Sequence, residues 1–461
     1  MKSDPLTSLT REMPSPLDPT TFTPHFSYEI AKSPSARRPR ILHCERTSVE
    51  AIADAVGTPA YLYSRASIVD AYKTLDSALA GLPHALCYAV KANANLSVLR
   101  LLAALGSRFD VVSGGEMARL RHIGVGGGSI VFSGVGKSRE EIREALRYRN
   151  GKSAPGIFMF NVESAAEMEV LLSEAAKRKP KSARTRDERP AVAIRINPDV
   201  QAGGHPHIST GYRQHKFGMD WSEARRIYLA NKDSRFIRWH GISAHIGSQI
   251  LTVDPFRRAL ERVADCVKDL ARNGISLPCI DFGGGLGIRY SDETPLNLVE
   301  YARELTRIVR PLGCQLLLEP GRWIVGPAGV LLTRVLYTKE NGGKKFAIVD
   351  AGMNDLIRPV LYNAAHAISK ARLNSDRGAS ATPVDVVGPV CETGDFLGRD
   401  VLLGEAKTGD LLVVWTAGAY GFVESSNYNA RPRAVEVMAD GKKFRVIRKR
   451  ETVKDMWRGE G

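Results

Sequence analysis

Residues 86–95 read LCYAVKANAN: an apolar run, Leu86–Val90, ends at Lys91, and a polar stretch follows it. The apolar run predicts a buried strand with Lys91 at its exposed end. At such a position we expect a lowered lysine pKa, which prepares the amine to form a Schiff base with an aldehyde cofactor. A solvated lysine at the end of a strand is the other interpretation, and the choice between them depends on the rest of the chain.

Short apolar runs like this one recur along the chain, with amphipathic helical stretches between them. The seven further runs are Phe109–Val112, Ile130–Phe132, Ile157–Phe160, Ala191–Ile196, Trp239–Ala244, Leu277–Phe282 and Leu316–Leu318. The clearest helical stretches are Ser97–Leu105, Arg139–Arg147, Ser164–Lys177 and Phe256–Arg272. Eight strand–helix units of this total length, close to the roughly 250 residues typical of the fold, favour a (β/α)8 TIM barrel over a doubly wound sheet.

Each predicted strand ends in polar residues or glycine. The strand ends carry Lys91, Ser113–Glu116, Ser133–Gly134, Asn161, Asn197, His245–Ser248, Gly283–Gly285 and Glu319–Arg322. In a TIM barrel these ends converge on one mouth, where active sites are found. The pattern therefore predicts a single active site at the barrel mouth.

Beyond residue 326 the pattern changes to β-type runs separated by turns. These are Val330–Tyr337, Lys345–Val349, Pro383–Val387, Leu411–Thr416 and Ala434–Met438. We predict an α/β protein with a disordered tail (1–25), a segment contributing to the β domain (26–60), the barrel (61–325) and a mostly β domain of Greek-key or sandwich type (326–461). The stretch Phe26–Ile30 is expected to join that domain as an N-terminal strand.

Composition excludes several classes of protein. The 461 residues include no apolar run long enough for a membrane span and no secretory signal, so a cytoplasmic location is the expectation. The six cysteines form no CxxC pair, which predicts free thiols and no metal site. The net charge of +15 arises largely in residues 177–189 and 442–450, which we interpret as solvated surface, with no nucleic-acid or membrane partner.

Three strand ends carry residues suited to a phosphorylated ring cofactor. Gly283–Gly285 follow the seventh strand, where barrel enzymes often bind phosphate through backbone N–H groups, although a tight turn would also use glycine. His245 is a core residue, a base, or a flat ring that stacks on a cofactor. Glu319 either holds a protonated pyridine nitrogen or pairs with Arg322.

A set of motifs in order, from about residue 45 to 435, resembles the fold-type III pyridoxal-phosphate-dependent decarboxylases. The motifs are Tyr88–Asn93, Arg195–Pro198, Ile208–Gly211, Lys216–Gly218, His245–Gln249, Gly283–Gly287, Glu319–Arg322, Cys391–Glu392 and Gly418–Tyr420. The segment 202–207 departs from the family pattern, and the insert 177–189 lies outside it.

The resemblance implies a site for pyridoxal 5'-phosphate. Lys91 would hold the cofactor aldehyde, His245 would stack on the ring, and Glu319 would pair with the pyridine nitrogen. The remaining cofactor-binding residues that it implies are Ser248, Gly283, Gly284, Gly285, Pro320, Gly321, Arg322 and Tyr420.

The resemblance also implies a substrate site. Arg322, Arg358, Tyr362 and Tyr420 would bind the substrate, and two arginine forks suit carboxylates. Arg358 is otherwise an ordinary turn residue beside a proline.

The Cys391–Glu392 pair has a separate implied role. Cys391 would return a proton to the carbon that loses carbon dioxide, and Glu392 would bind the distal ammonium of the substrate. Both residues would reach the barrel of a partner subunit, which implies a homodimer with shared sites. Cys391 is otherwise a buried small apolar residue.

The glutamate after Cys391 and the segment Ile208–Gly211 are features of the family members that act on meso-2,6-diaminopimelate. The implied reaction is decarboxylation of that compound to L-lysine and carbon dioxide, the last step of lysine biosynthesis. The alternatives are a broad-specificity decarboxylase of ornithine, arginine or lysine, and a non-catalytic regulatory member of the family.

Overall fold

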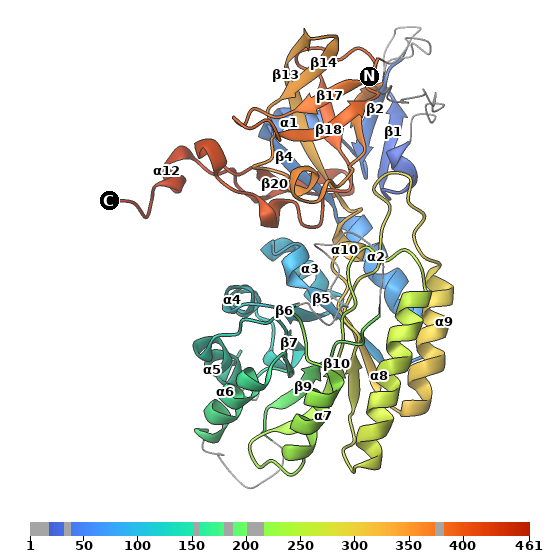
Figure 1. Cartoon of the computed structure of the whole chain (residues 1–461). Coiled ribbons are helices and arrows are strands. Elements are labelled where there is room, and N and C mark those ends of the chain that lie inside the picture. Colours follow the sequence, from blue (N-terminus) through green and yellow to red (C-terminus); the bar gives the residue numbers. More distant parts are fainter. Residues whose placement is uncertain (1–17, 32–37, 151–155, 179–187, 201–215, 374–381) are drawn as a thin grey trace, which may run out of the picture.

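The computed structural model describes residues 18–31, 38–150, 156–178, 188–200, 216–373 and 382–461. An α/β barrel forms the lower part of the chain in Figure 1, and a β-rich region lies above it. The predictions for residues 1–17, for most of the basic insert (179–187) and for the segment 202–211 lie outside the described residues.

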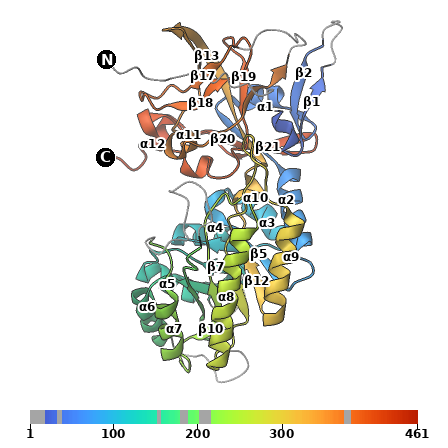
Figure 2. The same cartoon turned by 45° about the vertical axis from the view of Figure 1, so that its right-hand side comes forward.

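Eight parallel strands close into a barrel, which confirms the predicted fold. In spatial order they are β10 (Arg238–Ser243), β11 (Cys279–Asp281), β12 (Gln315–Leu318), β5 (His84–Ala89), β6 (Arg108–Val111), β7 (Ile130–Phe132), β8 (Met159–Val162) and β9 (Ala191–Arg195). A helix follows each strand: α3 (Leu96–Ala104), α4 (Gly114–His122), α5 (Arg139–Arg147), α6 (Ala165–Ala176), α7 (Trp221–Ala230), α8 (Asp254–Arg272), α9 (Leu298–Val309) and α10 (Arg322–Val325). Figure 2 shows these helices around the strands.

Local sequence signals explain where these elements begin. Ser138 and Glu141 form a capping box, in which each side chain binds the other residue's backbone N–H, and α5 begins directly after Ser138.

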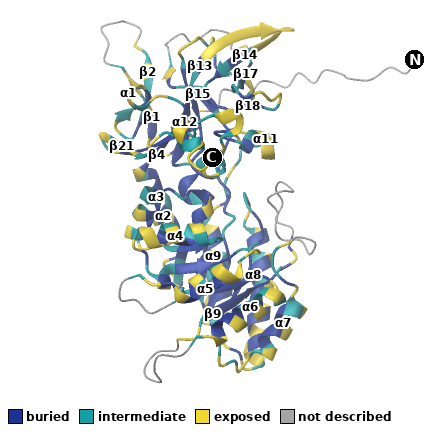
Figure 3. Ribbon diagram, turned by 90° about the vertical axis from the view of Figure 1, so that its left-hand side faces the viewer, coloured by how far each residue is buried: buried dark blue, intermediate teal, exposed yellow. Residues whose placement is uncertain are grey.

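Each predicted barrel run overlaps one observed strand, and the run Ile157–Phe160 corresponds to β8, which begins at Met159. Figure 3 shows β9 buried inside and the helices α5 to α8 carrying their exposed residues on the outside.

The inward-facing residues of the barrel change character along each strand. A lower apolar cluster lies inside the barrel and includes Cys87, Val131 and Leu317. Side chains of a strand alternate between its two faces, so the next inward-facing residue of each strand, closer to the mouth, lies two positions later in the sequence. Those residues are Ala89, Ser133 and Glu319, and with their counterparts Asp110, Asn161, Arg195, Ser243, His245 and Asp281 they form a mostly polar layer below the mouth.

A nine-stranded mixed sheet forms the β-rich region, and its longest strand, β13 (Gly329–Asn341), pairs with three others. The order is β18 (Phe396–Val401), β17 (Val384–Val387), β14 (Lys344–Val349), β13, β4 (Ala60–Ser64), β20 (Val435–Asp440) and β21 (Lys443–Arg448), with β19 (Leu411–Val414) and β15 (Ile368–Lys370) off this path. Tyr61 and Tyr63 pack in one core and Leu62 in the other, so both faces of the sheet are buried.

The N-terminal segment joins the β-rich region through a small separate sheet. Strand β1 (Phe26–Ile30) pairs with β2 (Arg40–Cys44), which also pairs with β16 (Arg372–Leu373) and β3 (Thr47–Ser48). Phe26 packs edge-on against the ring of Trp415, with 5.7 Å between ring centroids. Helix α1 (Val49–Val56) follows β3.

The predicted start of the barrel, at residue 61, is wrong by a few residues. Residues 61–64 were placed in the barrel, but they belong to β4, which lies in the nine-stranded sheet between β13 and β20. The apolar run of β4 is buried on both faces, and a sequence pattern cannot tell which of two sheets buries such a strand. Helix α2 (Arg65–Ala78) then leads from β4 to the first barrel strand.

None of the helices in the described part of the chain has the length and hydrophobicity needed to cross a membrane. All six cysteines are described, and none forms a disulfide. Five of them are buried, and Cys391 is exposed.

Candidate active site

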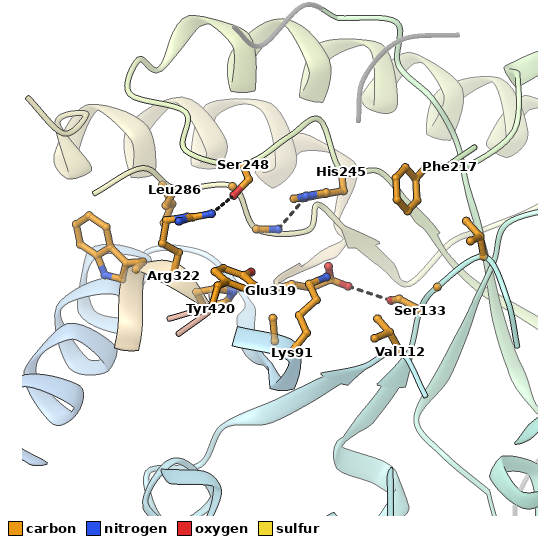
Figure 4. A pocket seen from close by; sticks show the side chains of 18 of the residues that line it. Lys91, Val112, Ser133, Phe217, His245, Ser248, Leu286, Glu319, Arg322 and Tyr420 are labelled. Atoms are coloured by element: carbon orange, nitrogen blue, oxygen red, sulfur yellow. Dashed lines mark hydrogen bonds between the residues drawn. The ribbon is translucent and has the colours of Figure 1, made fainter. Parts of the chain in front are cut away.

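A cavity of about 450 Å³ lies at the barrel mouth, between the strand ends and the β-rich region. Figure 4 shows Lys91 and Glu319 reaching into it on the side opposite His245 and Ser248. Of the predicted site residues, the cavity wall includes Lys91, His245, Ser248, Gly284, Gly285, Glu319, Pro320, Gly321, Arg322, Arg358, Tyr362 and Tyr420. The described structure therefore brings most of the predicted set together.

Lys91 lies in a short 3-10 turn, Val90–Ala92, directly after β5. Its side chain is 41% exposed, and the ammonium is 3.6 Å from Oδ2 of the buried Asp110. Burial favours a lower pKa for Lys91, but Asp110, helped by Tyr420 and Glu319, outweighs it and raises the pKa. The expectation of a lowered pKa is therefore wrong for the protein without cofactor, because a carboxylate lies beside the amine.

Three carboxyl groups lie in the polar layer below Lys91: Asp110, Asp281 and Glu319. Burial raises the pKa of all three, and for Asp281 it does so to about 6. Neighbouring carboxylates reinforce this effect, since Asp110 and Asp281 also raise the pKa of Glu319. Such a cluster favours a bound group that brings positive charge or a hydrogen-bond donor.

A hydrogen-bonded chain connects two of these carboxyl groups. Asn161 donates to Asp281 Oδ2 at 2.7 Å and to Ser133 Oγ at 3.0 Å, and Ser133 donates to Glu319 Oε1 at 3.3 Å (Figure 4). Asp281 Oδ1 also accepts from the backbone N–H of Gly283 at 3.2 Å. These hydrogen bonds thus link Glu319 to the glycine loop, Gly283–Gly285.

His245 faces the cavity from the end of β10. Burial lowers its pKa well below the usual value, and the charges of Arg195 and Lys91 act in the same direction, so the imidazole is neutral. The backbone N–H of Gly284 donates to His245 Nδ1 at 3.3 Å. A neutral flat ring held in this way suits stacking on an aromatic ligand.

The glycine loop passes too close to other backbone for a side chain. A Cβ on Gly284 would lie 2.3 Å from the carbonyl oxygen of Glu319, and one on Gly285 would lie 2.5 Å from that of Gly247. Gly285 also has a φ of +105°, which L side chains rarely adopt. Gly284 and Gly285 line the cavity, whereas Gly283 packs behind them against His245.

Two buried arginines flank the far end of the cavity. Arg322 donates to Ser248 Oγ at 3.0 Å (Figure 4) and to the Tyr290 hydroxyl, and its guanidinium lies 4.9 Å from the ring centroid of Tyr420. Arg358 begins the short helix α11 (Arg358–Tyr362), whose last residue, Tyr362, also lines the cavity. The ordinary-turn interpretation of Arg358 is wrong, since the side chain is buried at the cavity wall.

His366 holds Arg358 from behind. His366 Nδ1 lies 2.8 Å from the carbonyl oxygen of Trp415, and Arg358 Nε donates to His366 Nε2 at 3.3 Å. Burial, together with Arg358, lowers the pKa of His366 to about 3, so the ring stays neutral and Nε2 can accept. This contact orients the guanidinium toward the cavity.

Cys391 and Glu392 are not in the cavity of this chain. Both are exposed, so the alternative of a buried apolar Cys391 is wrong. The Cys391 backbone N–H donates to Asn429 Oδ1 at 2.8 Å, and Glu392 Oε1 accepts from the Tyr428 hydroxyl at 2.6 Å. If they act at an active site, it belongs to another subunit.

Several polar residues at or around the cavity were not among the predicted site residues. Asp110, Arg195 and Asp281 lie on inward positions of barrel strands, and alternation along those strands would have indicated them. His366 and Glu424 come from the β-rich region, where no periodic signal points toward the barrel mouth.

Comparisons with known proteins agree with this geometry. The profile of the pyridoxal-dependent decarboxylases, pyridoxal binding domain, matches residues 65–326. A diaminopimelate decarboxylase of Pseudomonas aeruginosa is 47% identical over 419 residues, covering 91% of this chain and 96% of that protein. The chain belongs to the diaminopimelate decarboxylase family.

Solved structures of diaminopimelate decarboxylases have the same fold. The structure from Helicobacter pylori, complexed with L-lysine, has a TM-score of 0.81 and 41% identity, covering 89% of this chain and 98% of that chain. The structure from M. jannaschii, in co-complex with L-lysine, has a TM-score of 0.83 and 33% identity, covering 94% of this chain and 98% of that chain.

The cavity fits pyridoxal 5'-phosphate, the cofactor of the diaminopimelate decarboxylase family. Both carboxylate oxygens of the buried Asp110 accept no hydrogen bond from the described residues, and the acidic layer suits a protonated pyridine nitrogen. The glycine loop, without side chains, leaves room for a phosphate at the cavity wall, and Lys91 supplies an amine.

Substitution of Gly284 by alanine tests whether the glycine loop binds the phosphate of the cofactor. We expect Gly284→Ala to weaken binding of pyridoxal 5'-phosphate by about 10- to 100-fold, because the new Cβ must push the loop away from Glu319. Fluorescence titration of the apoprotein with pyridoxal 5'-phosphate measures this, and circular dichroism checks the fold. Gly128→Ala is the control, since a Cβ there meets nothing within 4 Å; equal affinities for the two variants would contradict a binding role for the loop.

Proposed function

We propose that the protein is a carboxy-lyase that removes carbon dioxide from meso-2,6-diaminopimelate and releases L-lysine, the last step of lysine biosynthesis. The observation that carries this proposal is the pair of buried arginines, Arg322 and Arg358, in the same cavity as Lys91 and Glu319. Diaminopimelate has a carboxylate at each end. One leaves as carbon dioxide, and the two arginines suit the other.

The broad-specificity alternative fits the cavity less well. Ornithine, arginine and lysine, when they react at their α-carbon, carry no carboxylate at the far end. Their binding would leave a buried guanidinium without an anion, which is unfavourable. The non-catalytic alternative is disfavoured because Lys91, His245 and Glu319 lie together in one cavity.

Pyridoxal 5'-phosphate, when bound, supplies an aldehyde for covalent attachment and a ring that accepts the electron pair left by departing carbon dioxide. Lys91 is the amine for that attachment, and Asp110, 3.6 Å away, holds its ammonium at the cavity. Glu319 would pair with the pyridine nitrogen, and His245 would stack on the ring. Gly284, Gly285 and Ser248 would bind the phosphate, with Gly283 behind them.

Arg358 and Tyr362 bind the distal end of the substrate. Arg322 and Tyr420, which lie against each other, bridge the phosphate end and the substrate end of the cavity. Cys391 returns a proton from its Sγ to the carbon that has lost carbon dioxide, and Glu392 of the same segment binds near the substrate. Since neither residue lies in the cavity of its own chain, both would act in a partner's site.

The protein therefore works as a homodimer with shared sites. Exposed apolar side chains beside residues of the cavity wall and beside Glu392 support this proposal. They include Val135 of the cavity wall, Val360 and Leu361 beside Arg358, and Tyr428 beside Glu392, with exposed fractions from 38% to 49%. Apolar side chains gathered in this way are typical of a surface that a partner covers.

We place the protein in the cytoplasm. The six cysteines form no disulfide, and Cys391 in particular needs a free thiol to carry a proton. A reducing compartment keeps an exposed thiol in that state.

The purified protein should show a visible absorbance band from the cofactor bound through Lys91. Lys91→Ala removes the band and the adduct that borohydride fixes, because no other lysine lines this cavity among the described residues. Absorbance spectra and mass spectrometry of the reduced protein measure both. Lys73→Ala, at an exposed position, should keep them. A borohydride-fixed adduct in Lys91→Ala would assign the attachment to another lysine.

Substrate preference tests the proposed function. We expect kcat/KM for diaminopimelate to exceed that for ornithine, arginine or lysine by roughly 30- to 1000-fold, the effect of a charged group left unpaired. Carbon dioxide release on the four substrates measures it. Arg358→Ala should remove most of the preference and keep the cofactor band. Arg399→Ala, on an exposed arginine of β18, is the control. Comparable kcat/KM for ornithine in the unmodified protein would favour broad specificity.

Mixed inactive variants test the shared site. Lys91→Ala and Cys391→Ala are each expected to be inactive, yet mixing them should restore up to about a quarter of the wild-type activity, because one site of each mixed dimer combines the intact Lys91 of one chain with the intact Cys391 of the other. Native mass spectrometry confirms subunit exchange. Failure to recover activity after proven exchange would place Lys91 and Cys391 in one chain's site.

A further inference from the structure

Glu424 is an acidic residue at the cavity wall with no role assigned so far. It ends the short 3-10 helix Phe422–Glu424, close after Tyr420, and lines the cavity together with Arg322 and Arg358. Its Oε2 atom is buried and accepts no hydrogen bond from any described residue. A buried carboxylate oxygen without a donor is unfavourable, so its presence at a binding cavity points to a donor on the ligand.

The charges around Glu424 fit one part of the substrate. Burial raises the pKa of Glu424, while Arg358 and Arg322 act to lower it. Among the described residues Arg322 donates to Tyr290 and Ser248 and Arg358 donates to His366, whereas Glu424 Oε2 accepts no hydrogen bond, although all three side chains line the same cavity. The far end of the cavity therefore carries two cationic groups and one anionic group that do not neutralise each other directly.

Diaminopimelate has a matching distal end, where one carbon bears both a carboxylate and an ammonium. We infer that Glu424 binds the distal ammonium of the substrate while Arg322 and Arg358 bind the distal carboxylate, so that each chain supplies both charges of this subsite. The inference rests on the proposed function. It makes Glu424 a specificity-determining residue within the chain, in addition to Glu392, whose side chain lies outside this cavity.

A purely structural role is the competing explanation. In that case Glu424 only offsets the charge of the two arginines, and its substitution would change the binding of every substrate with a distal carboxylate to the same degree. A role in ammonium binding instead affects only ligands that carry the distal ammonium. The two roles are separated by a substrate that lacks this one group.

The test compares diaminopimelate with 2-aminopimelate of the same configuration at the reacting carbon, which lacks only the distal amino group. For the wild-type holoenzyme we expect kcat/KM to fall by about 10- to 100-fold when that group is removed. In Glu424→Gln the ratio between the two substrates should shrink to about threefold or less, because diaminopimelate loses its partner and 2-aminopimelate loses nothing. The cofactor band should be unchanged, which shows that the isosteric variant is folded and loaded.

Glu392→Gln is the matched variant, with the same substitution at the other candidate carboxylate. A ratio that shrinks in Glu424→Gln supports the inference, whatever Glu392→Gln does. A ratio that keeps its wild-type value in Glu424→Gln overturns it, and this includes the case in which only Glu392→Gln reduces the ratio.

An equilibrium measurement separates this inference from the proposed function. Calorimetric titration of the holoenzyme with L-lysine and with 6-aminohexanoate, which lacks the α-ammonium, gives the same comparison without turnover. L-lysine should bind about 10-fold or more tightly than 6-aminohexanoate to the wild type, and about equally to Glu424→Gln. No release of carbon dioxide from diaminopimelate by the wild type would contradict the proposed function alone, whereas an unchanged binding ratio in Glu424→Gln would contradict the role of Glu424.

Discussion

The pairing of the last barrel strand with the first is the constraint on which the site depends. Leu316–Leu318 of β12 pair with His84–Leu86 of β5, and beyond them the Ala89 N–H donates to the carbonyl oxygen of Pro320 at 3.2 Å. All eight strands are parallel, so closure brings their carboxyl ends to one mouth. Lys91 and Glu319 lie at opposite ends of the barrel sequence, and this pairing makes them neighbours.

The interior of the closed barrel also differs in polarity between its lower part and the layer below the mouth. The lower part is apolar and packs well, but the layer below the mouth contains Asp110, Asp281 and Glu319. Buried carboxyl groups destabilise a fold unless protons, hydrogen bonds or a cation compensate them. Their raised pKa values and the chain through Asn161 and Ser133 give part of that compensation. A cationic ring of a bound cofactor would give the rest, which is a physical reason to propose this layer as a binding site.

The β-rich region completes the site from the other side. Tyr420 adopts a positive φ of 55°, and its N–H donates to the carbonyl oxygen of Ala92 at 2.9 Å, so the segment before Glu424 is fixed to the turn that carries Lys91. His366 fixes Arg358 by a neutral ring nitrogen. In the proposed function, the chemistry of attachment thus belongs to the barrel, and the recognition of the distal end belongs largely to the β-rich region.

The sequence by itself determined the barrel, because short apolar runs, the amphipathic stretches between them and their spacing are local signals that survive without knowledge of contacts. It also determined which residues stand at the strand ends, since parallel strands must bring those ends together. Only the tertiary structure decided that β4 lies in the nine-stranded sheet, that Asp110 raises the pKa of Lys91, that His366 binds Arg358 from behind, and that Glu424 reaches the cavity. Pairing partners, electrostatic neighbours and loop positions depend on residues distant in sequence, so no local pattern encodes them.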